Sequence, residues 1–364
     1  MKKLSLVLSA LVLAALLAIP AAAQATLAYV RNPLHPTVFV AADDGSGAKK
    51  LVPGEDPHVS PDGKIVALLR QGSSLKSKPE MVLAPADGSA PSTVLAKGWR
   101  LPEVFSWSPD SKLVVAVLGP ELGKQRLVLI STETGAQRTL AHGFFNGVSF
   151  SPSGGEFVYG MAATEKFPPR SDLYRAEVLP PGAVSVKAVV PQRLTTDHNS
   201  SYPLWGPQKI VFVKTLDAKK RKYGPKNELY LMNPSGKGVK RLTHTKVDPL
   251  LQGLFPTAWS ASGSRLLAEF EGQDTSYAVA VDPMTGRQRQ VGIVTQTCSK
   301  LTACAAKKGF LDIVGTSLSS DGKFVLGYTG GFEPGPSHDV VSVPFPRGKP
   351  VVLAARAFEP DWNR

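Results

Sequence analysis

The feature of this sequence that most constrains its fold is a short turn phrase that returns along almost the whole chain. In its clearest copy, residues 59–64 read Val-Ser-Pro-Asp-Gly-Lys. Proline fixes φ, and aspartate and glycine allow a tight reversal, so each copy predicts a turn. Runs rich in β-formers follow, as at 65–69 and 210–213, and predict strands. The six copies begin at Val59, Trp107, Phe150, Trp205, Trp259 and Leu318.

A second phrase, an apolar strand that ends in a glycine turn, recurs in register with the first. Its seven copies end at Gly45, Gly88, Gly135, Gly182, Gly236, Gly286 and Gly348, a spacing of about 50 residues. A further short strand follows most copies, as at 192–195 and 240–243. The repeating unit therefore has four short strands. Because one small twisted sheet cannot bury both of its faces, such units stack radially, and the repeat predicts a β-propeller. The 33 glycines and 31 prolines, spread along the chain, argue against a helical bundle or solenoid.

The number of units, or blades, follows from the two ends of the chain. Residues 26–30 look like the second strand of a blade whose first strand is absent, and residues 357–362 resemble the approach to Trp107. We therefore predict an all-β fold, a seven-bladed β-propeller of four-stranded antiparallel blades. The C-terminal strand would pair with the N-terminal blade and close the ring. A six-bladed ring is the alternative.

The first residues have the pattern of a secretory signal peptide. Lys2 and Lys3 precede the apolar run 4–19, and Pro20 is followed by small residues at 21–23. We predict a signal peptide at 1–23 and one propeller domain at 24–364, with a periplasmic or secreted location. An uncleaved membrane anchor is the alternative.

The turn phrase resembles the repeat of the TolB-like propellers, relatives of the WD repeat. That repeat has the pattern Pro-x-Trp-Ser-Pro-Asp-Gly-Lys, and Arg-Leu-Thr after the fourth strand, as at 193–195 and 241–243. The resemblance implies an extracytoplasmic propeller, often a protein-binding platform. Similar repeats occur in peptidase propeller domains and in an oligogalacturonate lyase. TolB has an α/β domain before a six-bladed ring, whereas this sequence predicts seven blades and no such domain, so a role in the Tol–Pal system does not carry over.

Candidate ligand-binding residues come from the long, irregular connections at the end of the blades opposite the turn phrases, because variable loops on a rigid scaffold usually carry binding. Aromatic rings beside basic side chains suit sugars or peptides, and local packing is the alternative for Trp99. The predicted set is Trp99, Arg100, His142, Phe144, His198, Tyr202 and His244. Imidazoles from different blades could meet on a metal, but histidines on separate blades usually stay apart, so we predict neither a metal nor a cofactor. The remaining tryptophans, Trp107, Trp205, Trp259 and Trp362, should pack between blades.

Charge and cysteine content add two expectations. The formal net charge is +13, which favours anionic surfaces, and the densest basic run, 219–222, could engage an anionic polymer or simply be a solvated loop. Cys298 and Cys304 are the only cysteines. An even count in an exported chain favours a disulfide between them.

No nucleophile elbow, zinc-protease or phosphate-loop motif occurs in the sequence. We therefore predict no catalytic residues and a non-catalytic, exported binding platform, a monomer that recognises a protein or an anionic envelope polymer. Contact with a membrane surface fits the charge, and nucleic acid is not an expected partner. The alternative is a metal-assisted lyase or hydrolase acting on acidic polysaccharide.

Overall fold

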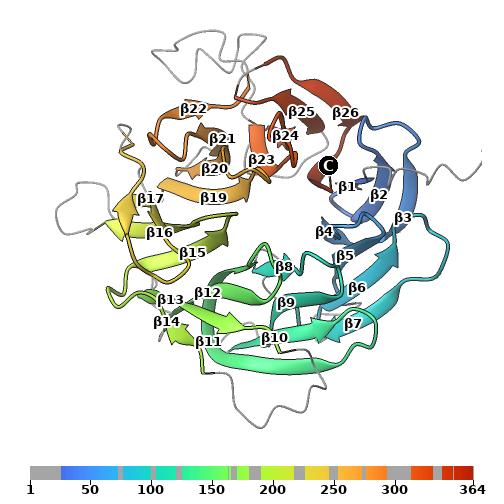
Figure 1. Cartoon of the computed structure of the whole chain (residues 1–364). Coiled ribbons are helices and arrows are strands. Elements are labelled where there is room, and N and C mark those ends of the chain that lie inside the picture. The colour runs from blue at the N-terminus through green and yellow to red at the C-terminus, as the bar shows by residue number, and fades with distance from the viewer. Residues whose placement is uncertain are drawn as a thin grey trace, which may run out of the picture.

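The strands of this chain form small antiparallel sheets that lie around a common centre (Figure 1). The computed structural model describes residues 26–72, 77–99, 104–119, 125–162, 164, 170–179, 190–216, 226–245, 253–272, 276–292, 313–330, 338–346 and 348–363. Within these residues the fold is all-β, with no helix and hence no helix that could cross a membrane. The all-β prediction is confirmed. The predicted signal peptide, Arg100, the basic run 219–222 and both cysteines lie outside the described residues.

Three sheets have four strands each. The first has the order β27-β1-β2-β3 and comprises β1 (Thr26–Arg31), β2 (Thr37–Ala42), β3 (Lys49–Pro53) and β27 (Phe358–Trp362). The second comprises β4 (Glu55–Val59), β5 (Ile65–Arg70), β6 (Glu80–Pro85) and β7 (Thr93–Lys97). The third comprises β23 (Ile313–Leu318), β24 (Phe324–Thr329), β25 (Asp339–Pro344) and β26 (Val351–Ala355).

Two larger sheets each contain more than one repeat. The seven-stranded sheet comprises β8 (Phe105–Trp107), β9 (Leu113–Leu118), β10 (Gln125–Ser131), β11 (Gln137–Phe150), β12 (Glu156–Ala162), β13 (Ser171–Glu177) and β14 (Gln192–Arg193). The eight-stranded sheet comprises β15 (Ser200–Trp205), β16 (Ile210–Leu216), β17 (Lys226–Met232), β18 (Lys240–Arg241), β19 (Gly253–Trp259), β20 (Leu266–Glu271), β21 (Ser276–Val281) and β22 (Gln288–Gln290).

The long strand β11 explains why two repeats merge into the seven-stranded sheet. Its first half, from Gln137 to Gly143, pairs with β10, and its second half, from Phe144 to Phe150, pairs with β12. The sequence predicts a connection here, but the chain passes from one repeat to the next without leaving the extended conformation. In the eight-stranded sheet, a single parallel pair between Asn227 and Gly253 joins the two repeats.

The recurrent serine and aspartate of the turn phrase form the same hydrogen bonds in successive copies. In the first copy, Ser60 Oγ donates to Asp62 Oδ1 over 2.7 Å and accepts from the Ile65 N–H over 3.0 Å. Asp62 Oδ1 also accepts from the Lys64 N–H over 3.2 Å. The copies built on Ser108 and Ser319 repeat this arrangement. Each turn therefore satisfies its own polar groups, which accounts for the repetition of these residue types.

Neighbouring repeats are held together laterally by side chains of their first strands. The indole Nε1 of Trp107 donates to the His58 carbonyl in the preceding sheet, and that of Trp259 donates to the Leu204 carbonyl, both over 3.3 Å. These two tryptophans pack between repeats, as predicted. Trp205 and Trp362 are buried.

The last strand, β27, makes the same kind of lateral contact and is paired with the first. It runs antiparallel to β1, with Leu27 opposite Trp362. Its two carboxylates bind the backbone of β4 in the next sheet. Glu359 Oε2 accepts from the Asp56 N–H over 3.1 Å, and Asp361 Oδ2 accepts from the Val59 N–H over 2.7 Å. The C-terminal strand therefore bridges two sheets that are otherwise built from the N-terminal part of the chain.

Asp361 should make the stability of the protein dependent on pH. Burial raises the pKa of this carboxyl from 3.8 to about 7, although the Val59 and Trp362 N–H groups partly oppose the shift. Because the pKa is higher in the folded state, stability present below pH 3.8 is lost as the pH rises towards 7. Asp361→Asn keeps an acceptor for Val59 and does not ionise. Relative to wild type, it should gain about 2 kcal/mol between pH 4 and 8, roughly half of the full linkage because the residue is partly exposed.

Urea unfolding at pH 4 and pH 8 measures this difference. Asp321→Asn provides a flat control, because hydrogen bonds from the Lys323 N–H and the Ser319 hydroxyl lower the pKa of Asp321 below its usual value of 3.8. The contribution of that carboxyl is complete above pH 3.8, so this variant should run parallel to wild type between pH 4 and pH 8. If the free energies of unfolding of wild type and Asp361→Asn changed in parallel with pH, the raised pKa of Asp361 would be contradicted.

Candidate functional site

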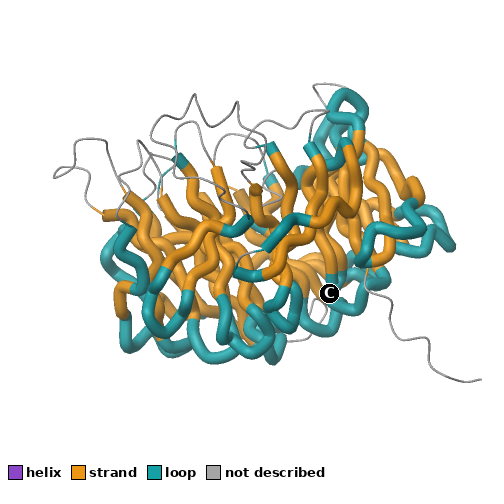
Figure 2. Tube along the Cα trace, turned by 90° about the horizontal axis from the view of Figure 1, so that it is seen from above, coloured by secondary structure: helices purple, strands orange, loops and turns teal. Residues whose placement is uncertain are grey.

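The two ends of the strands differ in chemistry. Figure 2 shows the strands standing side by side, with many short turns at one end of them. Because neighbouring strands are antiparallel, the turn phrases lie at one end of the strands, and the chain that leads from β14 into β15 lies at the other. We call this second end the connection end. Of the predicted ligand-binding residues that the structure describes, His198 and His244 lie in the chain between strands at this end.

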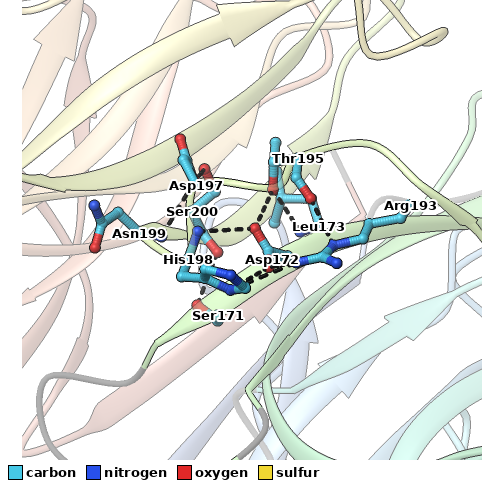
Figure 3. A network of polar contacts seen from close by, with 9 residues as sticks. All are labelled: Ser171, Asp172, Leu173, Arg193, Thr195, Asp197, His198, Asn199 and Ser200. Carbon is cyan, nitrogen blue, oxygen red and sulfur yellow. Dashed lines mark hydrogen bonds and ion pairs between the residues drawn. The ribbon is translucent and has the colours of Figure 1, made fainter.

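A buried carboxylate at the connection end organises several polar side chains (Figure 3). Asp172, at the start of β13, has a side chain that is only 4% exposed. Its Oδ2 atom accepts from Arg193 Nη2 and lies 2.9 Å from His198 Nδ1. Its Oδ1 atom accepts from the Thr195 hydroxyl over 3.1 Å and from the His198 N–H over 3.0 Å. One buried acid thus fixes an arginine of β14 and a threonine and a histidine from the chain between β14 and β15.

His198 is held in a conformation that presents its imidazole to solvent. Its φ angle is +56°, in the left-handed region, and its N–H bond to Asp172 helps to hold this backbone. The side chain is 59% exposed. With Nδ1 directed at the carboxylate, Nε2 is the ring nitrogen left for a ligand. The arrangement can donate or accept one hydrogen bond at a defined position.

A second ion pair supports the same loop from the other side. Lys214 Nζ on β16 lies 2.6 Å from Asp197 Oδ2. Burial opposes ionisation of Asp197, but hydrogen bonds from Lys214, Asn199 and Ser200 outweigh it and lower the pKa of this carboxyl. Asp197 is therefore charged at neutral pH, and it is satisfied by a cation and by N–H and O–H donors.

The same arrangement recurs one repeat further on, around Glu228 of β17. This side chain is fully buried and accepts from Arg241 Nη2, the Thr243 hydroxyl and the Thr245 N–H. The ammonium of Lys226, itself 8% exposed, lies 3.3 Å from Glu228 Oε1. The buried side chain of Glu228 is therefore contacted by four basic or hydroxylic side chains, which are Lys226 on the same strand, Arg241 on β18, and Thr243 and Thr245 after it.

The role of the Arg-Leu-Thr phrase follows from these two networks. In both copies the arginine Nε donates to the threonine carbonyl, and the arginine Nη2 contacts the buried acid. The threonine hydroxyl accepts from a backbone N–H of the third strand, Leu173 or Leu229. Asp172 and Glu228 were not among the residues predicted from the sequence. A sequence pattern marks them, because both acids precede a Leu-Tyr pair in the two repeats that carry Arg-Leu-Thr.

Trp99 lies in the core and not on the surface. Its side chain is fully buried, and it packs in one cluster with Leu118 and Ala96. Its ring centroid is 5.4 Å from that of Phe105 and 5.9 Å from that of His58. A ligand at the surface cannot reach this ring. The structure therefore corrects the predicted binding role and supports local packing for Trp99, because the β-bridge between Trp99 and Leu118 turns the side chain inwards.

The remaining predicted residues are separated. His142 is exposed and Phe144 is half-buried on β11, so His142 lies in a strand and not in a connection. Tyr202 is half-buried, with its ring edge against Phe255 at a centroid distance of 5.0 Å. His244 is exposed and lines a groove beside β22. Within the described residues, no group of three or more histidine, cysteine, aspartate or glutamate side chains is arranged to hold a metal ion.

Comparisons with known proteins bear on the fold. No family model and no curated protein sequence matches the chain. The β-propeller domain of the Trilobed protease from Pyrococcus furiosus matches with a TM-score of 0.59 and 15% identity, over 91% of this chain and 92% of that one. An oligogalacturonate lyase solved in complex with manganese matches with a TM-score of 0.53 and 14% identity, over 87% of this chain and 81% of that one.

TolB from Acinetobacter baumannii matches with a TM-score of 0.49 and 17% identity, over 93% of this chain. The chain spans 66% of the length of that TolB. Identities of this size establish architecture and not activity. With its small antiparallel sheets set around a common centre, this chain has an all-β fold of the β-propeller kind.

Proposed function

We propose that the sheets are seven four-stranded blades and that β27 closes the ring. Dividing the two larger sheets within β11 and at the Asn227–Gly253 pair leaves four-stranded repeats throughout. The β27–β1 pairing and the two carboxylate bonds to β4 support closure by the C-terminal strand. Closure would leave a rigid frame from which the connection end projects.

We propose that the protein is an exported binding platform and that its connection end recognises a protein or an anionic envelope polymer. The observation that carries this function is the Asp172 network. A buried carboxylate fixes Arg193 and His198, which are 39% and 59% exposed, so donors reach solvent in a set geometry. Preorganised donors bind with a smaller loss of conformational entropy, and the net charge of +13 favours an anionic ligand.

The double variant Arg193→Gln, His198→Gln tests this proposal. Binding to polygalacturonate and to vesicles containing phosphatidylglycerol should be measured by co-sedimentation at low and high salt. We expect wild type to bind at least one of these probes, with affinity that falls as salt rises. The double variant should bind at least fivefold more weakly. Lys64→Gln, at the turn end with a side chain 79% exposed, is the matched control and should bind like wild type. Equal binding by all three proteins would contradict a role for the connection end.

One observation favours the second candidate, a metal-assisted lyase or hydrolase acting on acidic polysaccharide. An imidazole held at Nδ1 by a buried carboxylate is the arrangement that orients histidines in general-base and metal sites. Formation of a conjugated double bond or of new reducing ends from polygalacturonate would demonstrate such an activity. Elemental analysis of protein purified without chelator tests the metal. Loss of a stoichiometric metal on substituting His142, His198 or His244 would overturn the non-catalytic proposal.

Export and the disulfide belong to the same proposal. A signal peptide at 1–23 would deliver the chain to an oxidising compartment, where Cys298 and Cys304 would pair. Thiol titration of the protein exported from its host should find no free thiol, and Cys298→Ser should change global stability only modestly, because so short a loop removes little chain entropy. Two reactive thiols in the native exported protein would contradict the bridge.

A further inference from the structure

A cleft of about 280 Å³ lies at the end of the strands that carries the turn phrases, between the strands β19–β22 and the neighbouring sheet β23–β26. These two groups of strands follow one another around the common centre (Figure 1). One wall is formed by residues 264–265 and by the ends of β21 and β22, and the other by Phe345 and Pro346, which follow β25. The cleft lies at the opposite end from the Asp172 network, so an inference about it does not depend on the proposed function of the connection end.

The strand register places three arginines on the first wall. Arg265 stands opposite Asp282, at the next position of the β20–β21 ladder, and the Asp282 N–H donates to the Arg287 carbonyl over 2.9 Å. Arg289 lies opposite Ala280 of β21. Opposite residues of an antiparallel pair, and residues two apart along a strand, project from the same face. The three arginines therefore share the face that packs against β23–β26, and all of them line the cleft.

Arg265 is held in place by the neighbouring sheet. Its Nη1 atom donates to the Gly322 carbonyl, and its Cζ atom lies 5.3 Å from the centroid of the Phe345 ring. Gly322 has a φ of +69°, and a Cβ atom at this position would lie 2.9 Å from Arg265 Cδ, so the glycine leaves room for the arginine side chain. A guanidinium group has five N–H donors. The bond to Gly322 therefore leaves donors of Arg265 for a ligand.

Arg287 and Arg289 add positive charge that is only partly neutralised. Arg287 is exposed and Arg289 is half-buried, and among the residues that the structure describes neither guanidinium forms an ion pair or a hydrogen bond. The acidic residue of the described lining is Asp282, whose Oδ1 atom accepts from the Met284 and Thr285 N–H groups over 2.9 and 3.0 Å. These bonds and the charge of Arg287 lower the pKa of Asp282, so it is ionised at neutral pH. The lining thus has three positive charges and one negative charge.

Such a lining matches a phosphate monoester better than a carboxylate. At neutral pH a phosphate monoester carries about −1.5 to −2 charges and has three oxygens that accept strong hydrogen bonds. Each guanidinium fork can bind two such oxygens. A carboxylate has one charge and two oxygens, and cannot engage three guanidinium groups equally. Phe345 and Pro346 form an apolar wall beside the arginines, and charges attract more strongly beside an apolar surface than in water.

We propose that this cleft binds a phosphate monoester in its doubly charged form. Arg287 and Arg289 bind the phosphate oxygens from the edge strand, and Arg265, held against Phe345, binds them from the side of the neighbouring sheet. The volume suits a phosphate with a short organic group. A soluble phosphate ester and a lipid whose headgroup is a phosphate monoester share this chemistry.

Calorimetric titration with glycerol phosphate at low salt and pH 8 tests the proposal. Dimethyl phosphate and acetate, which carry one charge each, are the comparison ligands. We expect glycerol phosphate to bind, and both comparison ligands to bind at least tenfold more weakly. Arg287→Gln combined with Arg289→Gln should weaken glycerol phosphate binding at least tenfold. Arg289→Lys keeps the charge but loses the planar fork, and should give an intermediate loss.

Lys50→Gln combined with Lys240→Gln is the matched control. Both lysines are exposed, on β3 and β18, so this variant loses the same charge away from the cleft. It should bind glycerol phosphate like wild type, and thermal unfolding checks that every variant is folded. The proposal would be overturned if glycerol phosphate did not bind, if the double arginine variant bound it unchanged, if the lysine variant lost as much affinity, or if either comparison ligand bound equally well.

Co-sedimentation with vesicles containing phosphatidic acid, a phosphate monoester, distinguishes the two sources of the ligand. Vesicles containing phosphatidylglycerol, a diester, are the comparison. If glycerol phosphate binds, phosphatidic acid vesicles that retain wild type but not the double arginine variant would support a lipid headgroup. Equal retention of the two proteins would support a soluble ester. Arg193 and His198 are kept in all of these variants, so failure here is distinct from failure of the connection end.

Discussion

Deletion of residues 358–364 should abolish cooperative folding of the protein. The deletion removes β27, which pairs with β1 and binds β4 through Glu359 and Asp361. It also removes Phe358 and Trp362, which are 4% and 5% exposed. Loss of a large buried aromatic side chain costs about 3–5 kcal/mol. Two such losses are comparable to the whole free energy of unfolding of a typical domain, about 5–15 kcal/mol.

The deletion also leaves an unpaired edge. The N–H and C=O groups of β1 that now face β27 would be exposed as a strand edge, a template for association with other chains. Thermal unfolding followed by circular dichroism, together with size-exclusion chromatography, should show a broad or absent transition and aggregates. Adding a peptide of residues 356–364 should restore a cooperative transition, because it can pair with β1 from outside the chain. A truncated protein that melts like the full-length chain would show that β27 does not hold the first sheet in place.

Glu228→Gln should destabilise the protein by about 3–5 kcal/mol, because it removes one member of a buried charge pair. The side chain of Glu228 is fully buried, and Lys226 beside it is 8% exposed. Without the carboxylate, the Lys226 ammonium would stay in the interior without its counter-ion. The amide would also have to accept the hydrogen bonds of Arg241, Thr243 and Thr245 with a single oxygen.

Chemical denaturation of wild type and variant at neutral pH measures this loss. Glu156→Gln is the matched control, since Glu156 pairs with Arg175 over 3.3 Å but is 34% exposed. Surface pairs of this kind contribute about 0–1 kcal/mol, so the control should stay close to wild type. Equal effects of the two substitutions would mean that Glu228 is not the structural centre of its network.

The repeat could be predicted because its signal is local. The turn phrase needs serine, aspartate and glycine at set positions, since the hydrogen bonds of Ser60 and Asp62 close within six residues. The strands that follow each turn, such as β5 and β16, are apolar runs of β-formers and lie close to their predicted positions. Trp107 and Trp259 could be assigned to the contacts between repeats because each is the first residue of a copy of the turn phrase.

The candidate site could be predicted only in part. His198 and His244 were found because they stand in connections, but Trp99 was placed there too and lies in the core. An aromatic side chain beside a turn has no local feature that distinguishes surface from interior. Asp172 and Glu228 are single acids in apolar strands. Their structural role depends on arginines and threonines that lie 13 to 23 residues away in the sequence.

The sequence by itself determined the strand repeat, the turns and the all-β class, because these depend on interactions between residues a few positions apart. Only the tertiary structure decided which side chains meet. It brought Arg193 and His198 onto one buried carboxylate, and it packed the turn at Gly286 against the Leu242 carbonyl. Such contacts depend on the angle and separation of packed sheets. Those quantities arise from the summed packing of many side chains and are encoded in no single stretch of the chain.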